Sequence, residues 1–201
     1  MKTDSHHRIP LLSGATLGVI LLLAEVILIL VSWLLSATMT EGVRSLLSGE
    51  GIRWFFGGFV DIIASPLLVW LLLILIALGS LQKSGLLAMQ RSYREKVALR
   101  SALLLLAVYV VVILLLTVAP HAALLSVTGS LFPSAFSRSL VPVVAFGIVL
   151  VSISFGVMSG RIQSLAAVVE ALSFGISKGA ELFVLYILFM QFYKSLWFVF
   201  G

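Results

Sequence analysis

The stretch SALLLLAVYVVVILLLTVA, residues 101–119, is almost uninterrupted leucine, valine and isoleucine and holds no charged side chain. As an α-helix, with a rise of about 1.5 Å per residue, it is about as long as the hydrocarbon core of a bilayer is thick. The whole chain shares this character, because 61% of its 201 residues are hydrophobic, 10% are charged, and its mean hydropathy is +1.22. A soluble domain cannot bury so much apolar surface, so the sequence predicts an integral membrane protein.

Further apolar runs lie on both sides of this stretch. Together they predict an all-α, polytopic fold with about five spans in a single membrane domain, 1–201, at approximately residues 11–36, 63–81, 101–119, 140–158 and 179–200. Proline is tolerated in the first turn of a helix, which is where Pro66 falls in the second span. Asp61, just before that span, is expected to serve as an interfacial cap.

Two shorter segments do not fit a membrane span. Residues 41–59, EGVRSLLSGEGIRWFFGGF, are too polar to cross a bilayer and carry an aromatic cluster, which indicates an interfacial aromatic segment. Between the last two spans, apolar residues recur at helical spacing and predict an interfacial amphipathic helix: Ile162, Leu165, Ala166, Val169, Leu172 and Ile176.

The distribution of charge predicts the orientation. The connection between the second and third spans is strongly basic, with Glu95 as its acidic residue, and carries Lys83, Arg91, Arg94, Lys96 and Arg100. The positive-inside rule therefore places this connection and the N-terminus in the cytoplasm, in an inner (cytoplasmic) membrane. Because the basic residues lie between apolar runs, the net charge of +5 indicates orientation and no nucleic-acid partner. The absence of cysteine excludes disulfides and cysteine-ligated metal.

Three motifs follow one another along the chain. The first is LLSGEGIRWFFGGFVDIIASPLLVWLLLILIALGSLQKSGLL, with Leu46–Trp54 and the turn Lys83–Leu86. The second is TGSLFPSAFSRSLVPVVAFGIVLVSISFGVMSGRIQS, which ends in a glycine-basic-isoleucine turn. The third is LFVLYILFMQFYKSLWFVFG, with Gln191, Phe192, Trp197 and Gly201. In this order the motifs resemble helices of the AbgT family of p-aminobenzoyl-glutamate transporters, although Trp197 and Gly201 lie one position early.

The resemblance covers only part of the family's architecture. Family members are more than twice as long, with one hairpin-containing block where this chain has only the residues between Leu86 and Glu95, and a second beyond Gly201. In the family these two blocks form the mobile substrate-binding bundle, and the helices matched here form the dimerising scaffold. The resemblance therefore implies a homodimeric scaffold, and no family substrate or sodium ligand is carried over to a residue of this chain.

Two polar residues inside the spans are candidate substrate-binding residues. Glu25 lies mid-span on a face with small residues, and a charged side chain there is costly, at about 2.5 to 3.5 kcal/mol on insertion scales. It is expected to carry protons, to bind a cationic group, or to be a protonated acid bonded to a neighbouring helix. Gln191 is a candidate for substrate binding or for helix packing. No cofactor or metal is expected, because His6, His7 and His121 lack ligand spacing.

Small residues at four-residue spacing predict close helix packing, within the monomer or across a homodimer. They are Gly14, Gly18, Ser152, Gly156, Gly160, Gly175 and Gly179. The span at 101–119 lacks such a face and is expected to meet membrane lipid.

Three functions remain open at this level. The first is a scaffold that serves a transport complex with a second membrane transport subunit. The second is an autonomous small transporter of p-aminobenzoyl-glutamate or a related aromatic anion. The third is a structural or regulatory interaction protein that transports nothing. An enzyme is not expected, because the sequence has no phosphate loop, no nucleophile with a base and no paired carboxylates.

Overall fold

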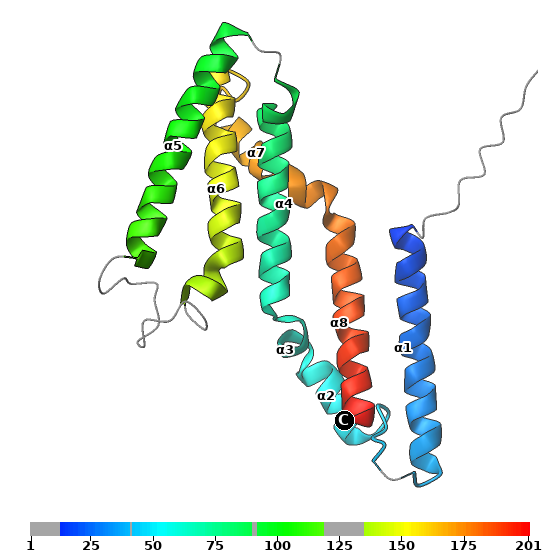
Figure 1. Cartoon of the computed structure of the whole chain (residues 1–201). Helices are drawn as coiled ribbons and strands as arrows, with labels where there is room; N and C mark the ends of the chain where they lie inside the picture. The colour runs from blue at the N-terminus through cyan, green and yellow to red at the C-terminus, as the bar shows by residue number, and fades with distance from the viewer. Residues whose placement is uncertain (1–12, 41, 90–91, 119–134) are drawn as a thin grey trace, which may run out of the picture. The chain divides into compact units, whose positions relative to one another are not determined.

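The computed structural model of the chain describes residues 13–40, 42–89, 92–118 and 135–201 (Figure 1). These residues form helices and turns, with no strand among them, so the predicted all-α fold is confirmed. The helices are α1 Gly14–Ala37, α2 Gly49–Gly57, α3 Phe59–Ile63, α4 Pro66–Ser84, the short 3₁₀ helix η1 Leu86–Ala88, α5 Tyr93–Val118, α6 Ala135–Ser159, α7 Leu165–Lys178 and α8 Ala180–Phe200. His6, His7, His121 and residues 128–134 of the quoted motifs lie outside the described residues.

Five helices in the described ranges are long and apolar enough to cross a membrane, which makes the chain a multi-pass membrane protein. They are Gly14–Ala37, Pro66–Ala88, Tyr93–Thr117, Ser139–Ser159 and Ala180–Phe200. The third begins well before the predicted residue 101, because Arg94 to Arg100 are helical. Ser92 starts this helix, as its side chain and its carbonyl accept the amides of Glu95 and Lys96. Charged residues therefore extend the helix beyond its apolar part.

The second span starts later than predicted. Proline lacks an N–H and disfavours a helical conformation in the residue before it, so α3 ends at Ile63 and α4 begins anew at Pro66. The prediction that Asp61 caps this span was wrong, because the cap lies at another residue. Asp61 lies inside α3 and is exposed, whereas the Ser65 hydroxyl accepts the amide of Leu67 at 3.2 Å.

The chain divides into two compact units. Unit 1 comprises residues 1–68 and 180–201, and unit 2 comprises residues 69–179. Two compact units can belong to one domain, so the single membrane domain 1–201 stays a prediction.

In unit 1, α1 and α8 run side by side in the same direction (Figure 1). Gly14 lies against Glu181 at their first turns, and Leu28, in the second half of α1, packs with Phe198 and Val199 in the last turn of α8. Two helices that run in the same direction enter the membrane from the same side. The chain must therefore cross the membrane an odd number of times between them. The three candidate spans between α1 and α8 agree with this requirement.

The aromatic segment of unit 1 folds into α2 and α3 beside the end of α8. Ser48 caps α2, accepting the amide of Gly51 at 3.0 Å, and Gly58 separates α2 from α3. The Trp54 ring stacks on Phe198 at 4.6 Å between centroids, while Phe56 is exposed. The cluster is thus half packed against α8 and half free to meet the membrane interface.

In unit 2, α5 and α6 are antiparallel and pack through small residues. Ala98 and Ala102 of α5 are buried against Phe155 of α6, whereas Leu104 and Leu115 on α5 are exposed. A face of α5 is therefore available to lipid, in line with its expected role.

Helix α7 forms close to the predicted position but starts at Leu165, because the Ser164 hydroxyl accepts the amide of Ala167 at 3.1 Å. Ile162 belongs to the preceding turn and is buried beside Gly156. Within the helix, Ala171 and Gly175 are buried, while Leu165 and Val169 of the predicted apolar face remain exposed. The helix thus packs through Ala171 and Gly175 and leaves Leu165 and Val169 uncovered.

Candidate functional site

The two candidate residues of the spans lie in unit 1, in or beside the contact between α1 and α8. The Ser195 hydroxyl, fully buried on α8, donates a hydrogen bond to Glu25 Oε1 at 2.7 Å. Gln191 precedes Ser195 by one helical turn on the same face of α8 and is 6% exposed. Glu25 Oε2 and both polar atoms of the Gln191 amide are buried and have no partner among the described residues.

A second polar link in unit 1 fastens the loop after α1. The buried Ser32 hydroxyl donates to the carbonyl of Ile29 at 2.8 Å and accepts the amide of Leu46 at 3.2 Å. The backbone amide of Arg44 donates to the carbonyl of Val199 at 3.0 Å. These bonds hold the end of α1 to the end of α8.

The predicted small residues mostly face other segments of the same unit. Gly18 lies 3.8 Å, measured from an added Cβ, from Leu185 and Leu188 of α8. In unit 2, Gly175 of α7 lies directly against the backbone of Leu75 and Gly79 on α4, and Gly179 lies against the Leu75 side chain. The buried Ser152 hydroxyl on α6 has no partner among the described residues. Close packing inside each unit therefore uses most of these residues.

Two glycine turns meet arginines at one end of unit 2. Gly85, after α4, and Gly160, after α6, adopt the left-handed conformation at φ +72° and +81°, which favours glycine. The Arg161 side chain lies where a Gly85 Cβ would stand, and the Arg94 side chain lies where a Gly160 Cβ would stand. Both turns therefore need glycine for space as well as for conformation.

Hydrogen bonds and an ion pair hold this glycine–arginine junction together. Arg161 Nη2 donates to Glu95 Oε1 at 2.8 Å and lies 3.5 Å from the carbonyl of Ala88. Arg94 Nε donates to the carbonyl of Met158 at 3.2 Å. The Glu95 side chain is only 10% exposed, so its ion pair with Arg161 is largely sheltered from water. The junction joins the ends of α4, α5 and α6.

This junction was not predicted from the sequence. Arg94 and Glu95 were interpreted as charges that set the orientation, and Arg161 as the basic residue of a glycine-basic-isoleucine turn, but not as partners of one another. A usable signal was present, since Glu95 is a lone carboxylate in a basic connection and Gly85 and Gly160 each end a helical pattern before a turn.

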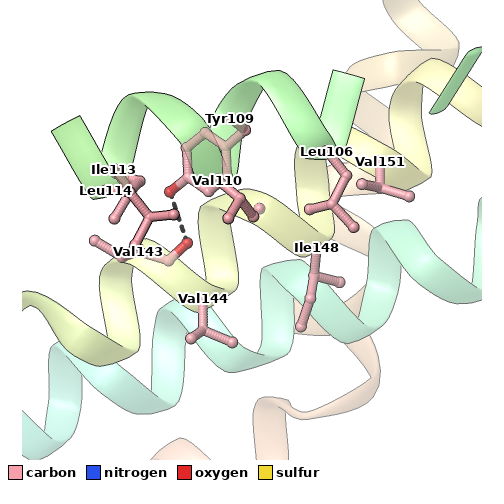
Figure 2. Close-up of a pocket in the computed structure, with 10 residues that line it drawn as sticks. Leu106, Tyr109, Val110, Ile113, Leu114, Val143, Val144, Ile148 and Val151 are labelled. Atoms are coloured by element: carbon pink, nitrogen blue, oxygen red, sulfur yellow. Dashed lines mark hydrogen bonds between the residues drawn. The ribbon is translucent and has the colours of Figure 1, made fainter. Parts of the chain in front are cut away.

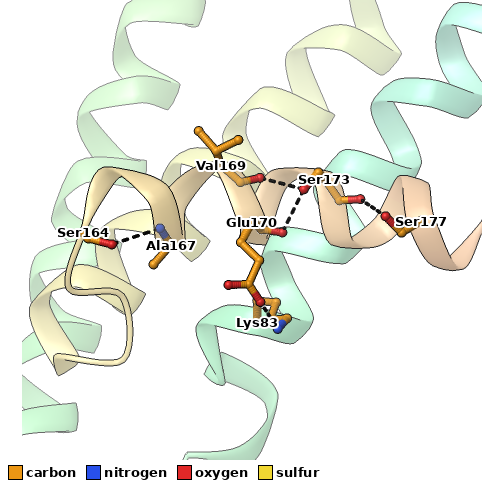
Figure 3. A network of polar contacts seen from close by, with 7 residues as sticks. All are labelled: Lys83, Ser164, Ala167, Val169, Glu170, Ser173 and Ser177. Carbon is orange, nitrogen blue, oxygen red and sulfur yellow. Dashed lines mark hydrogen bonds and ion pairs between the residues drawn. The ribbon is translucent and has the colours of Figure 1, made fainter.

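A second ion pair joins α7 to α4. Figure 3 shows Glu170 reaching from α7 to Lys83 on α4, where the two atoms Oε1 and Nζ are 2.6 Å apart. Lys83 and Lys178 also lie over the Phe174 ring, at 4.7 and 4.8 Å from its centroid. The hydrogen bond from Lys83, and then its charge, lower the pKa of Glu170 from its ordinary value of 4.5.

This lowered pKa predicts a small pH dependence of the α4–α7 contact. A carboxylate whose folded pKa lies below its unfolded value stabilises the fold above 4.5 and loses that effect as pH falls through the folded pKa. We expect the melting temperature of the wild type to exceed that of Glu170→Gln slightly at pH 7, with the difference shrinking below pH 4.5 and vanishing below the folded pKa of Glu170. Lys83→Met should remove the same pH dependence. A difference that stayed constant down to pH 3 would contradict this interpretation.

An apolar cavity of about 400 Å³ lies along the contact of α5 and α6 (Figure 2). Aliphatic side chains line it, together with Tyr109, whose hydroxyl donates to the carbonyl of Val143 at 2.8 Å. The Tyr109 ring packs on Gly147, 3.1 Å from an added Cβ. The Tyr109 hydroxyl is therefore already hydrogen-bonded. The remaining lining is apolar and suits a hydrocarbon ligand, not a carboxylate.

The described residues contain no group of three histidine, cysteine or acidic side chains placed to hold a metal ion. The polar arrangements of the described residues include the Glu25–Ser195–Gln191 group in unit 1, and the glycine–arginine junction and the Lys83–Glu170 ion pair in unit 2. No family model, curated protein or solved structure matches the chain.

Proposed function

We propose that this chain is an AbgT-like membrane protein reduced to the scaffold and dimerisation part, and that it supports a transport complex. The glycine–arginine junction of unit 2 carries the proposal. Both turns that resemble the family, Lys83–Leu86 and Gly160–Ile162, are part of this junction, although 73 positions separate Arg161 from Ala88. Two motifs that are far apart in the sequence thus take part in one packing arrangement. A scaffold requires fixed packing of this kind.

The contacts of α7 also support a scaffold role. The close approach of Gly79 and Gly175 fixes α7 on α4, and the ion pair of Lys83 with Glu170 fixes the same two helices. Backbones in direct contact cannot slide past each other without losing packing. Unit 2 is thereby suited to serve as a rigid body against which another subunit moves.

The proposed location is the inner (cytoplasmic) membrane with the N-terminus in the cytoplasm. The glycine–arginine junction brings Arg94 and Arg161 to the end of unit 2 where Lys83 also lies, at the end of α4. A concentration of basic residues at one end of several spans is typical of the cytoplasmic side.

The proposed homodimer rests on the resemblance, since the glycine faces that also suggested it are mostly occupied inside the units. We expect mass measurement in mild detergent to give a dimer at micromolar protein, together with a stoichiometric second membrane protein when the protein is purified from its native membrane. Arg161→Met should reduce recovery of the second protein, and Arg100→Met, an exposed arginine on α5, should not. A monomer without any companion would contradict the scaffold proposal.

The second candidate is an autonomous transporter, and the unpaired polar atoms of Glu25 and Gln191 favour it. A dianion such as p-aminobenzoyl-glutamate needs several fixed donors in a pocket that excludes water. Glu25 has the wrong sign when ionised, and the cavity between α5 and α6 is apolar. Transfer of the dianion into either place would be strongly unfavourable.

We therefore expect no uptake of labelled p-aminobenzoyl-glutamate by proteoliposomes that contain the purified protein alone, with either a sodium or a proton gradient. Empty vesicles give the background. Gradient-driven uptake above that background would favour the autonomous transporter, and its loss in Glu25→Gln would place the route in unit 1.

A further inference from the structure

The α1–α8 contact of unit 1 contains buried polar atoms that its own side chains do not satisfy. Glu25 Oε2 and the Gln191 Oε1 and Nε2 atoms are buried, and none has a hydrogen-bond partner in the described part of the chain. Such atoms are uncommon in folded proteins and indicate a bound water, ion or other polar ligand. Gln191 is 6% exposed, so bulk water does not reach it.

Helix geometry brings these groups to one stretch of the contact. The Ser195 hydroxyl donates to Glu25 Oε1 at 2.7 Å, which links α1 to α8 directly. Gln191 lies four residues before Ser195, and side chains at this spacing share a face of the helix. The Gln191 amide therefore lies about one helical turn along α8 from the bonded carboxylate and hydroxyl of Glu25 and Ser195.

The bonding pattern defines the chemistry of the missing ligand. The Ser195 hydroxyl donates its proton to Glu25 Oε1. Glu25 Oε2 and Gln191 Oε1 therefore remain as acceptors with no donor, and Gln191 Nε2 remains as a donor with no acceptor. Hard cations bind oxygen acceptors of this kind. Glu25 is the carboxylate of the group, so one positive charge neutralises it, whereas a divalent ion would leave a net charge in the membrane, which is unfavourable.

We propose that unit 1 binds a small monovalent cation of the Na⁺ type between Glu25 and the oxygen atoms of Ser195 and Gln191. The ion neutralises the carboxylate and satisfies the buried acceptors. It thereby links α1 to α8, whose parallel contact closes unit 1. The site lies inside one unit, so it depends neither on a dimer nor on a transport partner.

The test uses the purified full chain in detergent at pH 8, where competition from protons is weak. Melting temperatures are compared in sodium, potassium and choline chloride at equal concentration, and ²²Na⁺ binding is measured at equilibrium. A ligand at ten times its dissociation constant raises the melting temperature of a chain of this size by about 3 °C or more. We expect such a rise in sodium over choline, with about one ion bound per chain.

Variants locate the site. Glu25→Gln is expected to abolish the sodium-dependent rise and the binding of ²²Na⁺. Gln191→Leu, which keeps the carboxylate, should weaken sodium binding at least about tenfold. Glu50→Gln makes the same chemical change at an exposed carboxylate of unit 1 and should leave the rise intact.

Three results would overturn the proposal. They are equal melting temperatures in sodium and choline, a sodium-dependent rise that persists in Glu25→Gln, and stability that responds to pH but not to sodium. The last result would identify a proton as the ligand of Glu25. If Glu25→Gln does not fold, the comparison of Gln191→Leu with the wild type decides the question through the same ²²Na⁺ measurement.

Discussion

Replacing Gly175 by leucine is expected to separate α7 from α4 and to destabilise unit 2 by more than about 3 kcal/mol. A Cβ on Gly175 would stand 2.7 Å from the carbonyl carbon of Leu75 and 2.9 Å from the amide nitrogen of Gly79. Those neighbours are backbone atoms of α4, which cannot rotate away as a side chain can. The helices must move apart, and the ion pair of Glu170 with Lys83 would be lost with the packing.

Equilibrium unfolding by denaturant in detergent measures this effect, and cleavage by trypsin at Lys178 reports whether α7 is attached. Val169→Leu is the matched control, because it adds bulk on the same helix at a side chain that is 64% exposed. We expect the control to unfold as the wild type does. An equal unfolding midpoint for Gly175→Leu and Val169→Leu would show that the two backbones are not in contact.

Arg161→Met is expected to cost about 2 to 3 kcal/mol, the second largest effect. The guanidinium lies 2.8 Å from a Glu95 carboxylate whose side chain is 10% exposed. Removing the positive charge leaves the carboxylate poorly solvated. The arginine is itself 34% exposed, which keeps the cost at the lower end of the range for buried pairs.

A double substitution separates the charge effect from the loss of packing. Adding Glu95→Gln to Arg161→Met removes the uncompensated charge and should recover part of the lost stability. Arg100→Met, at an exposed position of α5, should change stability by less than about 0.5 kcal/mol. If Arg161→Met behaves like Arg100→Met, the junction does not stabilise unit 2.

The spans were predictable because a long apolar stretch has few alternatives in a bilayer, where the helix satisfies every backbone group internally. Their ends were less predictable. Residues 94–100 carry several charges and are helical nonetheless. Ser92 caps the start of this helix, and charged side chains are readily accommodated where a helix extends beyond the hydrocarbon core. The restart at Pro66 follows from proline's own geometry. The cap at Ser65 was missed because aspartate and serine are about equally good capping residues, so residue type alone does not choose between Asp61 and Ser65.

The candidate residues were predictable one at a time but not as a group. An acidic residue in the middle of a span is conspicuous, so Glu25 could be selected from the sequence. Its partner Ser195 could not, because 170 positions separate the two and small polar residues are common in membrane helices. The glycines show the same difference, since their spacing indicated close packing without naming the helix they face.

The sequence by itself determined the membrane class, the five candidate spans and the short helix near residues 165–178, because these depend on hydrophobicity and on local capping. Only the tertiary structure decided the parallel contact of α1 with α8, the contact of Gly79 with Gly175, and the positions of Arg94 and Arg161 over Gly160 and Gly85. Hydrophobic periodicity describes one helix at a time. The choice of neighbour depends on which backbones can approach and which buried charges can pair, and both are properties of two helices together.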